Sequence, residues 1–524
     1  MKTDWRSWTN KTIDELNVGL FERKEIIAST LLTVLSGQSV FLYGPPGTAK
    51  SLISRRISCA FSDSKYFEYL MQRFSTPEEL FGPVDIGELK KNNYVRDTEN
   101  YLPTADIAFL DEIWKSSPAI LNTLLTIINE RKFKNGKQVE DVPLKALIAA
   151  SNEFPQKNSG LDALYDRFIM RLHVGPLNSE KNFLSMICDN KTQSFVKVSS
   201  PISNKEWTEL MSQAHGIKVP KQTLNSIKKI RKAIDLFNQS SSSSELYISD
   251  RRWQKAVYVL KMAALLSGRD EVWESDLFIL KNALWSSEDD KPVLEKIICD
   301  SIDSEGYSSS DYSKWKEGYD ELKKETEEIF RKATKAKTVS YRRKECYKTK
   351  GQILVNSYDS GYGYYYQKQQ VPFTSGVPYG CEAKTVDYYF IKDDIVIGGS
   401  GQATVTGGQK YTFSVIGIDK GVAKVKVNNQ VLSFNITSPA SIVSKNIKTT
   451  YLRSIQGSIE SIDSLIKETK NALSEREDLI KSPFISDSDA EHSLKSMQSV
   501  LNDMEKSRID AKSLLSSVKS HATQ

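Results

Sequence analysis

Residues 39–51 read SVFLYGPPGTAKS, and this stretch decides the fold of the first part of the chain. Its apolar start, residues 40–42, is typical of a buried parallel strand. Gly44–Ala49 then form a tight loop whose backbone N–H groups converge, and Lys50 opens a helix whose positive end points to the same place. A triphosphate is expected there, with Lys50 on its β- and γ-phosphates and the Ser51 hydroxyl on Mg²⁺. The residues expected to contact the nucleotide are Gly44, Pro45, Pro46, Gly47, Thr48, Ala49, Lys50, Ser51 and Leu52.

The loop departs once from the pattern G-x-x-x-x-G-K-[ST], because Ala49 stands where the second glycine is expected. We expect Ala49 to have helical dihedrals, since its methyl group is then tolerated. For this loop alone, the alternative is an ordinary strand–turn–helix with a chance lysine.

Composition limits the class of protein. The chain has 524 residues, enough for about three or four domains at roughly 100–200 residues each. Its net charge of +6 is small for this length and makes nucleic-acid binding an unfavoured interpretation. The 5 cysteines are scattered, which argues against zinc or a disulfide framework and for a reducing cytoplasm. The first residues lack an apolar signal segment, and no run approaches ~18 apolar residues, so we expect no membrane segment.

A second motif follows the next buried strand. Residues 107–110 are apolar and lead directly into Asp111 and Glu112. Ligands of open α/β sheets bind at the carboxyl ends of strands, where these two carboxylates are expected. Asp111 is suited to hold the Mg²⁺ shell, and Glu112 to polarise the water that attacks the γ-phosphate. A solvated carboxylate pair beside a helix cap is the alternative for this motif taken alone.

Two further segments add polar groups. Residues 144–150 form another buried strand, and Asn152 follows it, where an amide can bind the γ-phosphate or the attacking water. The segment LDALYDRFIMRLHVGPL predicts a short helix that carries Arg167 and Arg171 and runs into a strand near 172–174.

Together these residues resemble a family. The segments GPPGTAKSLISRR, EYLMQRFSTPEELFGP, FLDEIWKSSPAILNTLLTIINER, AASNEFP and ALYDRFIMRL are similar to the MoxR branch of AAA+ ATPases. Within that branch they look most like the regulatory-ATPase-variant-A (RavA) subgroup. The similarity is dense from Gly19 to Leu177, and an alanine at the position of Ala49 is typical of the subgroup.

The resemblance implies a role for each matching position. Lys50 and Ser51 correspond to Walker A, Asp111 and Glu112 to Walker B, and Asn152 to sensor 1. Arg167 corresponds to the arginine finger that reaches into a neighbouring subunit's site, with Arg171 as the alternative. The family also uses the segments that match 82–103 and 132–142 as inserts facing a central channel.

The resemblance also implies a helical lid at residues 178–290. Its helices are indicated by Trp207/Leu210/Met211/Ala214, Leu224/Ile227/Ile230/Ile234 and Trp253/Val257/Leu260/Ala264. Arg251 corresponds to sensor 2 on the γ-phosphate, with Arg252 as the alternative. A solvated arginine pair at the helix start is the structural alternative.

Beyond the lid, the resemblance is one of architecture. Heptad-like apolar positions in 291–342 and 441–524 predict a discontinuous three-helix stalk, with a long homodimeric coiled coil as the alternative. Arg508 interrupts this pattern, and the neighbouring Ile509 is expected to make the apolar contact instead. Residues 343–440 are rich in Gly, Val, Thr and Tyr, and turns such as Asn428-Asn429 indicate a small antiparallel β-barrel or sandwich inserted in the stalk.

The expected architecture is therefore multidomain, α/β plus α plus β. It comprises an AAA+ P-loop core with a parallel sheet (residues 1–177), a helical lid, a three-helix stalk and an inserted β domain. The resemblance implies ATP/ADP and Mg²⁺ as ligands, a homo-hexameric ring, remodelling or chaperone-like action on a protein client, and a von Willebrand factor A-domain protein as companion. The alternatives are a DNA-acting AAA+ motor and a nucleotide-gated scaffold that sequesters a partner.

Overall fold

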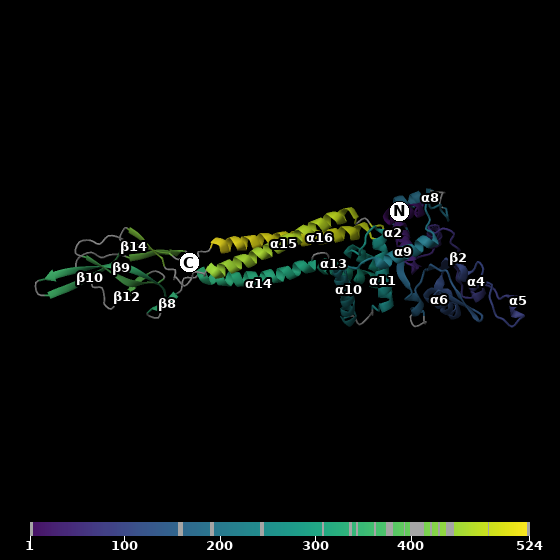
Figure 1. Cartoon of the computed structure of the whole chain (residues 1–524), viewed down its shortest axis with the longest axis horizontal. Coiled ribbons are helices and arrows are strands. Elements are labelled where there is room, and N and C mark those ends of the chain that lie inside the picture. The colour runs from purple at the N-terminus through teal and green to yellow at the C-terminus, as the bar shows by residue number, and fades with distance from the viewer. Residues whose placement is uncertain are drawn as a thin grey trace. The chain divides into compact units, whose positions relative to one another are not determined.

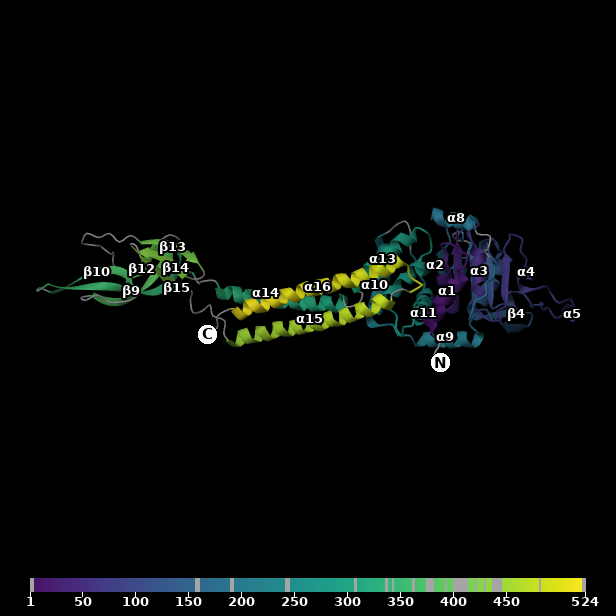
Figure 2. The same cartoon turned by 90° about the horizontal axis from the view of Figure 1, so that it is seen from above.

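The computed structural model describes residues 4–155, 161–188, 193–240, 246–305, 309–334, 445–479 and 482–520, and the backbone of strands between residues 338 and 435. The chain divides into two compact units. One unit is Met1–Ser313 with Leu465–Met504, and the other is Lys314–Ser464 with Glu505–Gln524. The elements of both units are labelled in Figure 1 and, from above, in Figure 2.

A five-stranded parallel sheet forms the centre of the first unit, with the strand order β2-β3-β6-β1-β7. The strands are β1 (Ser39–Tyr43), β2 (Tyr66–Leu70), β3 (Ile107–Asp111), β6 (Ala146–Ser151) and β7 (Phe168–His173). Strand β1 lies between β6 and β7, and β6 lies between β1 and β3. The carboxyl ends of β3, β6 and β1 are therefore neighbours at one edge of the sheet.

Helices cover both faces of this sheet. Successive residues of a strand point to opposite sides, so the apolar strands present apolar side chains on both faces. Val40 and Leu42 pack into the cluster that contains residues of α1 (Trp5–Leu16), α2 (Lys24–Leu35) and α3 (Lys50–Ser58). Phe41 packs on the other face, in the cluster that contains residues of α6 (Pro118–Glu130). The inner strands β1, β3 and β6 are buried on both faces, as their continuous apolar sequences predict, whereas the edge strand β2 is half-buried.

Two inserts interrupt the core and are held to each other. The first includes α4 (Pro77–Phe81), α5 (Ile86–Leu89) and the 3-10 turn η1 (Leu102–Thr104). The second is the hairpin of β4 (Lys132–Asn135) and β5 (Gln138–Asp141), which follows η2 (Ile113–Lys115) and α6. The Asn135 amide accepts from the backbone N–H of Arg96 at 2.7 Å and donates to its carbonyl oxygen at 3.0 Å. In Figures 1 and 2, α5 lies at the end of the core farthest from the lid helix α13 (Asp290–Glu305).

The lid covers the free edge of β7. Besides α13, the lid contains α8 (Glu180–Cys188), α9 (Asn204–Gly216), α10 (Lys221–Ser240), α11 (Asp250–Leu266), η3 (Glu274–Ile279) and α12 (Leu280–Leu284). The indole N–H of Trp285 donates to the carbonyl oxygen of Arg171 in β7 at 3.0 Å. This bond pairs a backbone group that would otherwise lie at an open sheet edge.

The prediction for the segment around Arg167 is partly wrong. The short helix near Arg167 is α7 (Asp162–Tyr165), and the strand after it begins at Phe168 rather than near 172. Arg171 consequently lies in β7 and not in a helix, because the apolar residues around it pair with β1.

Three long helices follow the lid: α14 (Ser309–Thr334), α15 (Lys445–Leu479) and α16 (Asp487–Ser520). In the second unit they share an apolar cluster made by Tyr319, Ile455 and Ala511, among others. The helices α15 and α16 are antiparallel, because Asp463 pairs with Arg508 at 3.4 Å and Lys448 donates to the carbonyl oxygen of Lys519. The predicted substitute contact by Ile509 is wrong, since Ile509 is 65% exposed while Arg508 itself makes the ion pair.

In the first unit, the connection between α15 and α16 returns to the lid. Phe484 and Ile485 are buried in the same cluster as the lid helices. Arg476 and Glu274 form an ion pair at 2.9 Å, and both side chains are almost fully buried. Lys281 of α12 pairs with Asp489 at 2.5 Å. The α15–α16 connection is thus an integral part of the lid's packing.

The strands between α14 and α15 are antiparallel. They are β8 (Thr338–Tyr341), β9 (Lys344–Ser360), β10 (Gly363–Phe373), β11 (Cys381–Ile391), β12 (Asp394–Gly398), β13 (Phe413–Asp419), β14 (Val422–Val427) and β15 (Gln430–Asn435). The first five form the path β10-β9-β11-β12 with β8 on β9, and the last three form a second sheet. The predicted turn at Asn428-Asn429 lies outside the described residues, and the predicted domain boundaries stay predictions. Among the helices described here, none has the length and apolarity needed to cross a bilayer.

Candidate functional site

The loop after β1 has the backbone that a phosphate cradle requires. A Cβ atom on Gly44 would lie 2.1 Å from the carbonyl oxygen of Val174, so only glycine fits there. Gly47 has φ +78°, and a Cβ built on it would meet nothing within 4 Å. The chain therefore leaves open space beside this part of the loop. A ligand can approach the backbone N–H groups there.

Ala49 has a conformation that the sequence did not predict. Its dihedrals are φ 72° and ψ 23°, which is the left-handed region, and it caps the N-terminus of α3. The expectation of helical dihedrals is wrong, because closing the loop onto α3 requires a positive φ at this position. A residue with a Cβ atom is disfavoured there by roughly 1–2 kcal/mol.

Lys50 lies under the loop and holds it closed. Its ammonium group donates to the carbonyl oxygens of Gly44 at 2.8 Å and Pro45 at 2.9 Å, and the residue is 7% exposed. An ammonium has three donors, so one remains for a ligand. Burial lowers the pKa of Lys50, while the negative charges of Asp111 and Glu112 raise it. The lysine and the two carboxylates thus act on one another electrostatically.

Asp111 ends β3, and Glu112 directly follows it. Burial raises the pKa of Asp111, and its carboxylate accepts from the backbone N–H of Glu112 at 3.0 Å. Glu112 has φ 52°, again in the left-handed region, which is uncommon outside glycine and frequent at functional sites. The Glu112 carboxylate lies 3.4 Å from the Ser151 hydroxyl, at the end of β6, and 3.4 Å from the ammonium group of Lys115.

Asn152 follows β6 beside the start of the loop. The register of the sheet places Tyr43 opposite Ser151, and the N–H of Gly44 donates to the carbonyl oxygen of Ser151 at 3.2 Å. Asn152 is exposed, while Ser51 and Leu52 are half-buried in the first turn of α3. The structure therefore brings the loop, Asp111, Glu112 and Asn152 to one edge of the sheet.

Sequence reasoning missed one residue of this site. The buried Arg23 donates to the carbonyl oxygen of Thr48 in the loop at 3.4 Å and to that of Gly175 at 2.6 Å. It thus ties the loop to the segment after β7. The only signal was its position in GLFERKEII, just before the phosphate loop, since its partners are backbone atoms that any residue supplies.

The candidate arginines lie elsewhere. Arg167 immediately precedes β7, so it lies at the amino edge of the sheet, opposite the loop. It lines a pocket of about 270 Å³ together with Arg251, Lys145 and residues 37–39, which precede or begin β1. The structure does not bring Arg167 or Arg251 to the chain's own loop.

Their neighbours Arg171 and Arg252 are structural. Each is 1% exposed, and each donates to the carbonyl oxygen of Trp285 at 2.5 Å. Arg251, by contrast, has a side chain that is 43% exposed and pairs with Asp166 at 2.6 Å. Of each predicted pair, Arg167 and Arg251 are thus the members available to a ligand.

The residues at the carboxyl edge fit a magnesium nucleotide. In the part of the chain that the structure describes, no cluster of three or more His, Cys, Asp or Glu side chains could hold a metal alone. Mg²⁺ in such sites takes one or two protein oxygens and completes its shell with phosphate and water. The Ser51 hydroxyl and the Asp111 carboxylate are suitable donors of that kind.

A parallel sheet of this order, with a glycine-containing loop and buried lysine after β1 and carboxylates after β3, defines an α/β phosphate-loop nucleotide-binding protein. The family comparison is more specific. The profile "MoxR domain in the MoxR-vWA-beta-propeller ternary systems" matches residues 8–203, and the profile "AAA lid domain" matches residues 222–298. The chain belongs to the MoxR family of AAA+ ATPases.

Three relatives show how far the similarity extends. The chain is 40% identical over 291 residues to the uncharacterized protein MJ0079 of Methanocaldococcus jannaschii, which covers 55% of this chain and 73% of that protein. It is also 40% identical to the uncharacterized protein MJ0812 of the same organism, over 281 residues that cover 53% of this chain and 72% of that protein. Structural protein ORF618 of Acidianus two-tailed virus is 28% identical over 228 residues, which cover 43% of this chain and 34% of that protein.

Proposed function

We propose that this chain binds ATP with Mg²⁺ at the loop after β1 and hydrolyses it. The observation that carries the proposal is the buried ammonium group of Lys50, held beneath the loop by Gly44 and Pro45 and subject to the charges of Asp111 and Glu112. A buried cation of this kind favours an anionic ligand at the loop.

Each residue at this edge then has one task. Lys50 turns its remaining donor, or exchanges its carbonyl partners, to contact the β- and γ-phosphates, and Ser51 and Asp111 hold the metal. Glu112 accepts a proton from the attacking water, and Asn152 orients that water or the γ-phosphate. The bound Mg²⁺ supplies neutralisation of the charge that develops on the phosphate oxygens.

Hydrolysis in this proposal depends on assembly. Arg167 lies at the opposite edge of the sheet from the loop, so it can reach only the γ-phosphate held by another copy. Arg251 shares its pocket, so we extend the same role to Arg251 rather than a contact with the chain's own nucleotide. We propose a homo-hexameric ring, since a closed ring supplies every loop with such a neighbour.

The proposed output is remodelling of a protein client, of the RavA type. The packing of the α15–α16 connection supports the idea that motion of the lid is transmitted to these helices. Phe484, Ile485 and the Arg476–Glu274 ion pair hold this connection in the lid. A lid that moves on hydrolysis would move these helices with it. The matching profile is described from systems that combine MoxR with vWA proteins, so we propose a vWA-domain protein as companion.

Two substitutions test the proposal. Lys50→Ala should remove nucleotide binding at the phosphate loop and abolish hydrolysis, whereas Glu112→Gln should keep binding there and lower the hydrolysis rate by about 10²–10⁴-fold. Lys205→Ala, an exposed lysine on α9, is the matched control and should hydrolyse ATP at the normal rate. Undiminished turnover by Lys50→Ala would refute the assignment of the loop.

The same Glu112→Gln variant separates a remodeller from a scaffold. Locked with ATP, a remodeller loses its biological effect, while a scaffold that only sequesters a partner keeps it. A DNA-acting motor would instead show hydrolysis that nucleic acid stimulates and that salt suppresses steeply.

A further inference from the structure

A large cavity lies among the lid helices α9, α10 and α11. Its volume is about 590 Å³, which is within the range of small-molecule sites. It adjoins the pocket of about 270 Å³ at the amino edge of the sheet, because Gln38, Met211 and Lys255 line both. The two together form one composite cavity, on the opposite edge of the sheet from the phosphate loop.

The smaller pocket is strongly cationic. Five basic side chains line it, and none of its described lining residues is acidic: the basic residues are Arg131, Lys145, Arg167, Arg251 and Lys255. Lys145 pairs with the buried Asp106, and Arg251 pairs with Asp166, but both acids lie outside the lining. The pocket therefore keeps an excess of positive charge that favours an anion.

Two of its guanidinium groups have unused donors. Nη1 of Arg131 and Nε of Arg167 are buried, and neither donates a hydrogen bond to the described residues. Burial lowers the pKa of Arg131 to about 10, so this group is still charged at neutral pH. Buried donors without acceptors are costly, and an oxyanion in this pocket could accept from them.

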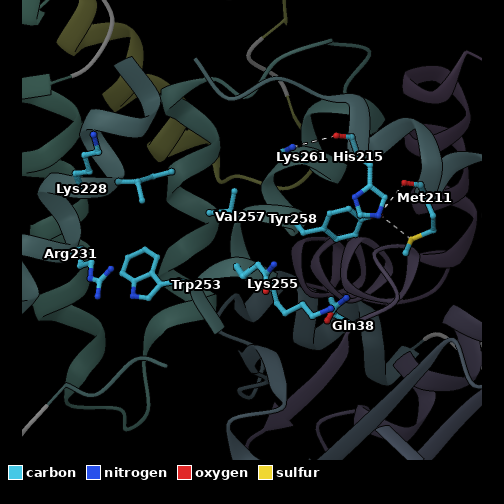
Figure 3. A pocket seen from close by; sticks show the side chains of 12 residues that line it. Gln38, Met211, His215, Lys228, Arg231, Trp253, Lys255, Val257, Tyr258 and Lys261 are labelled. Carbon is cyan, nitrogen blue, oxygen red and sulfur yellow. Dashed lines mark hydrogen bonds between the residues drawn. The ribbon is translucent and has the colours of Figure 1, made fainter. Parts of the chain in front are cut away.

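The larger pocket offers aromatic surface inside a basic rim. Figure 3 shows Trp253 beside Arg231, and Lys255 reaching toward Gln38. The ring of Tyr258 lies 4.6 Å from that of His215, and its hydroxyl donates to the carbonyl oxygen of Met211 at 3.1 Å. These contacts hold the rings in place, and rigid aromatic faces bind planar rings by stacking. Lys228 and Lys261 complete the rim, and no described lining residue is acidic.

We propose that this composite cavity is a second ligand site, which takes a phosphorylated compound with a planar aromatic ring, the class of a nucleoside phosphate. Its phosphoryl group lies in the smaller pocket with Arg131 and Lys255. Its ring lies in the larger pocket against Trp253. Lys255 belongs to both pockets and links the two parts of the ligand.

The test measures binding rather than hydrolysis, so its outcome does not depend on the proposed activity. Isothermal titration with ADP is performed on Lys50→Ala protein, in which the phosphate loop of every copy is disabled. One ADP should still bind per chain. Adding Lys255→Ala or Trp253→Ala should each weaken this binding by roughly tenfold or more, through lost charge and lost stacking.

The matched control is Lys205→Ala in the same background, since this exposed lysine lies on α9 but lines neither pocket. It should leave the ADP affinity unchanged, and thermal melting of all variants shows whether each one folds. Absence of ADP binding to folded Lys50→Ala protein would overturn the second site. So would ADP binding that neither Lys255→Ala nor Trp253→Ala weakens.

Discussion

Arg171 of β7 and Arg252 of α11 donate to the same acceptor, because one guanidinium nitrogen of each lies 2.5 Å from the carbonyl oxygen of Trp285. Both arginines are buried, and burial lowers the pKa of each. The charge of Arg171 lowers the pKa of Arg252 further. One arginine from the core and one from the lid therefore join the two parts through a single backbone oxygen.

Removing either arginine should destabilise the chain. We expect Arg171→Ala or Arg252→Ala to lower the free energy of unfolding by about 3 kcal/mol, since each leaves buried carbonyl groups without a charged donor. The double variant should lose more than the sum of the two, because the relief of the repulsion between the charges is gained in each single variant but only once in the double variant. Urea unfolding measures this, with the exposed Arg73→Ala as control. A double variant that loses only the sum would show that the two groups are independent.

The strained alanine of the phosphate loop predicts a stabilising substitution. Ala49→Gly should raise the free energy of unfolding by roughly 0.5–1 kcal/mol. Glycine relieves the steric strain of a positive φ in the folded state, and this gain exceeds the cost of its greater conformational entropy in the unfolded chain. Ala119→Gly, in α6, is the control and should lower stability by a similar amount. Equal effects of the two substitutions would contradict the left-handed assignment of Ala49.

The raised pKa of Asp111 predicts how nucleotide binding depends on pH. Metal binding needs the carboxylate, and burial raises the pKa of Asp111 above its usual value. Mg²⁺-dependent affinity for ATP should therefore weaken on acidification sooner than an ordinary aspartate would allow. Asp111→Asn should bind more weakly and lack this pH dependence, which titration calorimetry at several pH values detects.

In the chain without ligand, protonation of Asp111 affects the stability of the fold in the opposite direction to its effect on nucleotide binding. The folded state holds the Asp111 proton more tightly than the unfolded state does. The contribution of Asp111 to the free energy of unfolding should therefore fall as pH rises from the unfolded value of about 4 through the raised folded pKa. Comparing the chain with Asp111→Asn in urea across this range isolates the effect. A pH dependence that is the same in both proteins would exclude Asp111 as its source.

Mixing experiments test whether Arg167 acts on a neighbouring copy. Arg167→Ala alone should bind nucleotide but lose about 10³-fold or more in hydrolysis rate. Glu112→Gln alone should also be inactive, yet a mixture should recover part of the activity where an intact loop meets an intact Arg167. If the mixture stays inactive while the two proteins demonstrably assemble together, Arg167 acts within its own chain or not at all.

The sequence predicted the carboxyl edge of the sheet well because strand ends are local features. Lys50, Asp111 and Asn152 each directly follow an apolar run or its loop, and parallel strands bring such positions together. The conformation of Ala49 was not predictable, since its dihedrals are set by how the loop closes onto α3. Arg23 was missed because its acceptors are backbone oxygens of residues distant in sequence.

The buried stripe of α11 was only partly predictable. Leu260 and Ala264, two of the four apolar residues that indicated this helix, are buried, whereas Trp253 and Val257 are half-buried and line the lid cavity. Ala256, Val259 and Ala263 are buried as well. Arg252 lies four residues before Ala256, on the buried stripe, and Arg251 lies beside it. The small residues at 256 and 263 disguised this face, because a stripe of alanines is weakly apolar.

The place of Phe484 and Ile485 in the lid has a practical consequence for dissecting the molecule. A fragment that stops at residue 313 would contain both profile matches, yet it would leave an empty apolar socket where these two side chains belong. Such a fragment should aggregate and be poorly soluble, whereas a fragment that also includes residues 465–504, joined through a short linker, should be soluble. The smallest part of this protein that folds independently therefore combines two separate segments of the sequence, and a fragment cut at the family boundaries alone would lack one of them.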